Sequence, residues 1–126
     1  MNNLDTALEY YNRSLIIREE IGDKRGITNS LSNIGSIAFK TGDLELAEKN
    51  ALRALKLARE LGYSERVKDA ALLLKQIYRK QKKWILGFRM SDLFYKMRDS
   101  IRNEETKLVS IRQQAKYEIE RVEKEK

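Results

Sequence analysis

The sequence contains no cysteine, no histidine and no proline among its 126 residues. Without cysteine the chain cannot form disulfides or thiolate metal sites, so its redox compartment is not readable from the sequence. Without histidine it lacks the commonest general base and the commonest metal ligand. The glycines are isolated rather than grouped into a phosphate-binding loop, and no nucleophile stands with a base. We therefore expect no catalytic residues, no metal site and no cofactor.

Long apolar segments are also missing. No run approaches the roughly 18 apolar residues of a transmembrane helix, and the opening "MNNLDTALEY" lacks the basic start and apolar middle of a signal peptide. The composition, 41% apolar and 36% charged, is typical of a soluble, helix-rich domain. We expect a cytoplasmic protein without a membrane segment, or an extracytoplasmic one if the chain is a fragment of a membrane sensor.

The positive charge is concentrated in one segment. Residues 1–62 carry nine basic and nine acidic side chains, residues 99–126 carry seven of each, and residues 63–98 carry ten basic and three acidic ones. The whole net charge of +7 therefore belongs to the middle segment. Its centre predicts a basic patch made of Arg79, Lys80, Lys82, Lys83 and Arg89. Such a patch suits phosphate, an acidic helix or an anionic membrane surface, or it is simply a solvated helix end.

A 40-residue repeat runs through the chain. A shift of 40 residues aligns Ala7 with Ala47 and Gly87. The same shift aligns Gly22 with Gly62. Because apolar residues also recur at helical spacing within each unit, the repeat predicts a series of helix pairs.

Glycines mark the breaks between the predicted helices, and Asp or Ser next to them is a plausible N-cap. The breaks are expected at residues 22–26, 41–43 and 62–65. We expect helices at residues 4–21, 27–41, 44–61, 65–81 and 85–98, and a sixth that starts near residue 101 with Ser100 as its cap.

Small residues occupy helix positions where bulky ones are usual. Gly35 lies within a predicted helix, where glycine costs about 1 kcal/mol relative to alanine. A packing reason is the simplest explanation, because small residues let two helices approach closely. We expect Gly35 to lie against Ala47, and Ala54 to admit a helix of the next pair.

The segment "NSLSNIGSIAFKTGDLELAEKNALRALKLARELG" (residues 29–62) resembles a tetratricopeptide repeat of the 40-residue variety found in bacterial regulators. The pattern matches at Leu31, Ile34, Gly35, Ala38, Gly42, Ala47 and Ala54. It departs at Ala51, where an aromatic is usual, and at Lys75, where a small residue is usual. Residues 95–126 are similar to the connector that follows such repeats in bacterial sensor kinases and helix-turn-helix regulators.

This resemblance implies an all-α fold, an α-solenoid of antiparallel helix pairs. Residues 1–100 would hold about two and a half repeat units, and residues 101–126 a capping or connector helix. The implied function is a non-catalytic protein-protein interaction module that holds a peptide or helix in a concave groove. It would serve as the sensing or scaffolding part of a bacterial regulator.

The first helix of each pair would line the groove. Carried over position by position, the groove residues are Asn29, Ser32, Asn33, Ser36, Lys40, Asp69, Gln76, Arg79 and Lys80. Asn33 is the sharpest candidate, because an amide both donates and accepts and can pair with a ligand main chain. Leu73 stands where a second such Asn would repeat, and Asn33 can equally be a solvated polar residue.

Single-stranded nucleic acid is the alternative ligand. The predicted basic patch flanks Trp84 and Phe88, and bases stack on such aromatic rings. However, Trp84 aligns with Leu44 at the start of an outer helix, where we expect it to pack within the hairpin. We therefore disfavour nucleic-acid binding.

Both ends of the chain suggest incomplete packing. Residues 4–22 match the second helix of a repeat whose first helix is missing. Near the other end, Ile101, Leu108, Ala115 and Val122 repeat every seven residues, as in one half of a coiled coil. We expect the C-terminal helix to cover an exposed repeat, either by folding back or by exchange in a homodimer.

Overall fold

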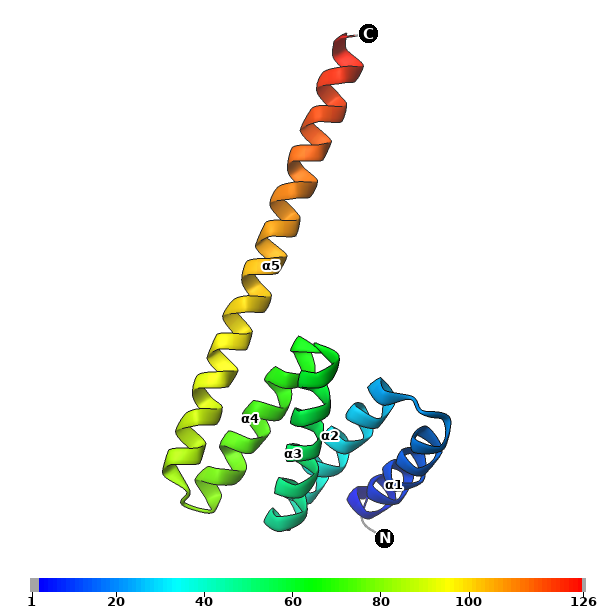
Figure 1. The fold of residues 1–126 in the computed structure, drawn as a ribbon, viewed down its shortest axis with the longest axis vertical. Coiled ribbons are helices and arrows are strands. Elements are labelled where there is room, and N and C mark those ends of the chain that lie inside the picture. The colour runs from blue at the N-terminus through cyan, green and yellow to red at the C-terminus, as the bar shows by residue number, and fades with distance from the viewer. Residues whose placement is uncertain (1–2, 126) are drawn as a thin grey trace.

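Five α-helices make up residues 3–125, the part of the chain that the computed structural model describes. They are α1 (Asn3–Ile21), α2 (Lys24–Thr41), α3 (Leu44–Leu61), α4 (Ser64–Lys80) and α5 (Trp84–Glu125). Figure 1 shows the first four helices and the start of α5 side by side, and the rest of α5 reaching far beyond them. The described residues contain no strand, so the all-α α-solenoid with a long C-terminal helix is confirmed.

The first three turns each contain a glycine with a left-handed φ angle, and an aspartate caps the helix that follows each of the first two. Gly42 and Gly62 adopt left-handed φ angles of 87° and 66° after α2 and α3, a conformation that favours glycine. The Asp43 carboxylate accepts a hydrogen bond of 3.2 Å from the Leu46 backbone N–H and caps α3. Because each of these connections is short, consecutive helices run antiparallel.

Four helix starts differ from the predicted ones: α1, α4 and α5 begin one residue earlier, and α2 begins three residues earlier. Helix α2 begins at Lys24 rather than at residue 27, because Asp23 caps it by accepting a 3.0 Å hydrogen bond from the Gly26 backbone N–H. Helix α4 has Tyr63 at its N-cap and no side-chain cap bond, so Ser64 is the first helical residue rather than the cap.

The core lies between α2, α3 and α4, with the first part of α5 closing one side. Leu74 and Ile77 of α4 are fully buried there, and Met97 of α5 packs against the same cluster. The predicted close approach at Gly35 is confirmed. A Cβ added to Gly35 would lie 3.4 Å from the Ala47 carbonyl oxygen and 3.2 Å from Leu73 Cδ2.

Helix α5 is continuous, so the predicted break at residues 98–100 is wrong. Ser100 is an ordinary helical residue, and the helix runs for 42 residues from Trp84. The physical reason is the absence of proline and glycine after Gly87, because extending a formed helix is easier than starting a new one.

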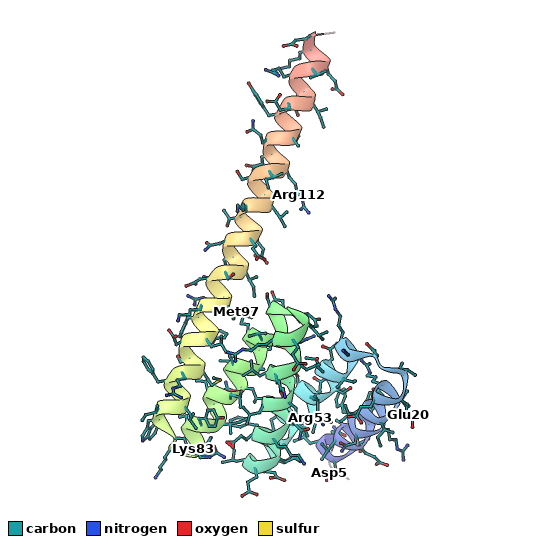
Figure 2. All side chains as sticks on the ribbon, in the orientation of Figure 1. Asp5, Glu20, Arg53, Lys83, Met97 and Arg112 are labelled. Carbon is teal, nitrogen blue, oxygen red and sulfur yellow. The ribbon has the colours of Figure 1, made fainter. Side chains whose placement is uncertain are left out.

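The distal part of α5 does not cap the repeats. Ile101 is half-buried, and beyond it nearly every side chain is exposed as far as Glu125. Of the two expected arrangements, folding back over its own chain therefore does not occur, and Figure 2 shows Arg112 on the projecting part, well clear of the repeats. Residues 1–2 and 126 of the predicted segments lie outside the described residues.

Candidate functional site

A small pocket lies between α2, α3 and α4, where the groove was predicted. Its volume is about 190 Å³, and its lining residues are Ser32, Asn33, Ser36, Ala51, Arg66, Asp69, Ala70 and Leu73. Four of them were predicted: Ser32, Asn33, Ser36 and Asp69. Helical spacing explains the arrangement, since residues three and four apart share one face of a helix. Leu73 forms the apolar part of the pocket, where a second Asn would have stood.

Buried polar atoms without partners gather at this pocket. Ser32 Oγ and Arg66 Nε are both buried and lack a hydrogen-bond partner, and both residues line it. Asn29 Oδ1, one turn earlier on α2, is buried and unpaired as well. Leaving such an atom unpaired costs about 1 to 3 kcal/mol, so a molecule that pairs with it gains a corresponding interaction.

Asn33 supplies the free amide that the sequence analysis singled out. Its side chain is half-buried and lines the pocket, and within residues 3–125 it makes no hydrogen bond. Its donor and its acceptor are therefore both available to a ligand.

Arg66 is the pocket residue that the sequence analysis missed. Its Nη1 donates to Asp69 Oδ2 at 3.0 Å, and its guanidinium lies 5.7 Å from the centre of the Tyr63 ring. These two contacts hold the guanidinium beside the pocket while leaving Nε unpaired. The available signal was the three-residue spacing from Asp69, which places oppositely charged side chains on one face of a helix.

The other predicted groove residues lie elsewhere. Lys40, Gln76 and Lys80 are exposed and do not line the 190 Å³ pocket. Arg79 lines a different pocket of about 260 Å³ between α4 and α5.

Three residues of the predicted basic patch line two neighbouring hollows. Lys82 and Lys83 border a third hollow together with Trp84, Ile85 and Leu86, and Trp84 also lines the neighbouring pocket that contains Arg79. Lys83 Nζ also pairs with Glu48 Oε1 at 3.4 Å. Figure 2 shows Lys83 at the turn between α4 and α5.

The expected packing of Trp84 within the hairpin is wrong. Trp84 is 65% exposed and Phe88 is 75% exposed. The reason is that, within residues 3–125, no further helix covers the face of α4 and α5 on which they lie.

Two classes of site are absent from the described part of the chain. No helix in residues 3–125 combines the length and the apolar character needed to cross a membrane. Within the same residues, no three carboxylates lie together as they would around a metal ion.

Comparison with known proteins agrees with the geometry. A family model described as tetratricopeptide repeat matches residues 1–60, which include α1, α2 and almost all of α3. No curated protein matches the chain. The antiparallel helix pairs and the close approach at Gly35 agree with this match, and residues 1–60 carry tetratricopeptide repeats.

Proposed function

We propose that the chain binds an extended segment of a partner protein in the groove between α2, α3 and α4. Tetratricopeptide repeats generally mediate protein-protein interaction. The observation that carries the proposal is the set of unpaired polar groups at the pocket: the Asn33 amide, Ser32 Oγ and Arg66 Nε. A peptide main chain supplies donors and acceptors along its whole length, so it can pair with all three.

The pocket favours recognition of the main chain over recognition of a charged side chain. The cation Arg66 is already paired with Asp69, so the polar lining presents little unbalanced charge. Leu73, Ala51 and Ala70 provide an apolar floor for one small side chain. The resemblance of residues 95–126 to a regulator connector supports placing this module in the sensing or scaffolding part of a bacterial regulator.

The test is a peptide library displayed on phage and selected against the full chain, followed by affinity measurements on a selected peptide. Asn33→Ala should weaken binding by about 1 to 3 kcal/mol, or roughly 5-fold to 150-fold in Kd, because the ligand main chain loses its partner. Asn12→Ala, at an exposed position of α1, is the matched control and should leave the affinity unchanged. Equal affinities of the two variants for every selected peptide would refute the groove as the site.

We also propose that the distal part of α5 pairs with a second copy of the chain. Leu108, on the stripe that repeats every seven residues, is 52% exposed. Ile111, three residues later on the same face of the helix, is 59% exposed. Parallel pairing would place Glu104 against its own copy in the seam. Antiparallel pairing centred between Leu108 and Ile111 instead brings Glu105 opposite Arg112 of the second copy, so apolar and charged contacts both favour it.

A further inference from the structure

The solenoid ends in a second, unfilled face, formed by α4 and the first part of α5. We call it the end face, and its residues are Lys75, Arg79, Trp84, Gly87, Phe88, Ser91 and Tyr95. The first six line the 260 Å³ pocket. Tyr95 lies beside them, because its ring centre is 5.5 Å from Lys75 Nζ.

The 40-residue repeat identifies what this face is shaped to hold. The shift aligns Gly87 with Ala47, Ser91 with Ala51 and Tyr95 with Leu55. In the earlier repeat unit, the face of α2 and α3 that contains the aligned residues is covered by helix α4.

Burial shows how much of the end face is left open. Leu55 is 5% exposed beneath its neighbours, whereas the aligned Tyr95 is 44% exposed. Ala51 is fully buried, whereas Ser91 is only half-buried. The end face therefore corresponds to the surface of α2 and α3 that α4 covers, but no helix covers it within the described residues.

Two cationic side chains of the end face indicate the charge of a helix that would bind there. Gly35 is where Leu73 of α4 packs in the earlier unit, and the aligned residue in the end face is the cation Lys75. Phe39 aligns with Arg79, a second cation. No acidic residue lines the end-face pocket, so a helix seated there must supply the negative charge.

We propose that the end face docks an amphipathic helix of a partner protein, with its apolar side on Trp84 and Phe88 and an acidic side chain toward Lys75. A second copy of the same face does not fit, because a twofold contact would bring Lys75 and Arg79 against their own copies. The rest of α5 does not cover the face either, because beyond Tyr95 it leads away from it along about 45 Å of helix. Single-stranded nucleic acid is less well matched, because Lys82 and Lys83 line the neighbouring hollow, which shares only Trp84 with the end-face pocket.

The test uses two synthetic peptides that copy residues 64–80, the sequence of the helix that fills the earlier face. One carries Leu73→Glu and the other Leu73→Lys, because position 73 is the one that faces Gly35, the counterpart of Lys75. Each is titrated into the isotope-labelled full chain, and the backbone amide shifts are followed by nuclear magnetic resonance. This readout also measures weak binding by a short, marginally helical peptide.

We expect the Glu peptide to shift the amides of the end face and to bind at least about tenfold more tightly than the Lys peptide, as for a pair of opposite charges worth about 1.4 kcal/mol. The chain variant Lys75→Glu should reverse this order. Phe88→Ala should weaken the binding of both peptides by similar factors. This variant should fold normally, because the Phe88 side chain is exposed.

Two results would overturn the proposal. The first is an end face whose amides do not respond to either peptide, or respond equally to both. The second is a 15-nucleotide oligothymidine that shifts the same amides and displaces the Glu peptide, since this would identify the face as a nucleic-acid site. Either result leaves the groove of α2, α3 and α4 unaffected, because the two sites share no residue.

Discussion

Gly35 allows a quantitative test of how closely α2 and α3 approach. A Cβ at this position would meet three atoms: Leu73 Cδ2 at 3.2 Å, the Ala47 carbonyl oxygen at 3.4 Å and the Ala51 backbone nitrogen at 3.5 Å. The shortest of these contacts is to the flexible end of a side chain that borders the groove pocket, so Leu73 can move aside into open space.

For Gly35→Ala, two effects of similar size oppose each other. Alanine gains about 1 kcal/mol of helix propensity over glycine, and displacing Leu73 costs about 1 to 2 kcal/mol, at the low end of overpacking penalties. We expect a net loss of unfolding free energy of at most about 1 kcal/mol. Gly35→Val adds two γ carbons that a helix holds in essentially one rotamer, and these meet the backbone of α3, which cannot yield. We expect a loss of about 3 kcal/mol or more.

The measurement is urea unfolding of the full chain, followed by circular dichroism at 222 nm. Lys56→Ala and Lys56→Val, at an exposed position of α3, measure the difference in helix propensity between alanine and valine without the packing effect. If Gly35→Val costs no more than Gly35→Ala plus that difference, the backbones of α2 and α3 are not in close contact at Gly35, and the packing explanation for this glycine fails.

The remaining predictions concern α4 and α5. Gly87→Ala should raise the unfolding free energy by up to about 1 kcal/mol, because the added Cβ makes only ordinary contacts, with Tyr78 Cβ at 3.6 Å and the Lys75 carbonyl oxygen at 4.0 Å; a loss of stability in urea unfolding would contradict this. Burial, and secondarily the charge of Glu48, raise the pKa of Tyr78 above 10.0. The neutral Tyr78 side chain therefore contributes its full stabilisation of the folded state below pH 10, and this contribution is lost as the pH rises through the folded-state pKa. Unfolding at pH 9 to 11 should therefore show a steeper loss of stability for the natural chain than for Tyr78→Phe, and equal slopes would contradict the cause. Leu108→Asp should abolish the self-association expected at micromolar concentration, whereas Thr106→Asp on another face of α5 should not; sedimentation of the natural chain as a monomer at all concentrations would refute the pairing.

The sequence predicted those elements whose ends are set by local chemistry. Helix α3 was predicted at residues 44–61 and occurs there, because Asp43 caps its start and Gly62 ends it. The contact of Gly35 with Ala47 was also predictable, because a costly glycine within a helix indicates a close neighbour. In both cases the residues that carry the pattern also make the contacts that it predicts, either a few residues apart or within one repeat unit.

The predictions that the structure does not match depended on which helices pack against one another in space. Trp84 was expected to be covered by analogy with Leu44, but the analogy carries over only if another helix follows on that face. The predicted groove residues are separated in the structure for a similar reason. Ser32, Asn33, Ser36 and Asp69 meet where three helices converge, whereas Gln76 and Lys80 lie beyond that convergence. Arg66 was missed because its role depends on Tyr63 and Asp69 together, a spatial relation that a repeat pattern does not encode.

Because α5 is one unbroken helix, it acts mechanically as a lever arm. Its first part is clamped against α4, with Met90 and Met97 packed on the core, and about 36 Å of helix extend from Ile101 to Glu125. A tilt of the clamped part by about 5° would move the far end by about 3 Å over such a length. A helix seated on the end face would press on the clamped part through Trp84 and Phe88. Small repacking between the repeats would thus become a displacement large enough to change the contacts of whatever touches the tip.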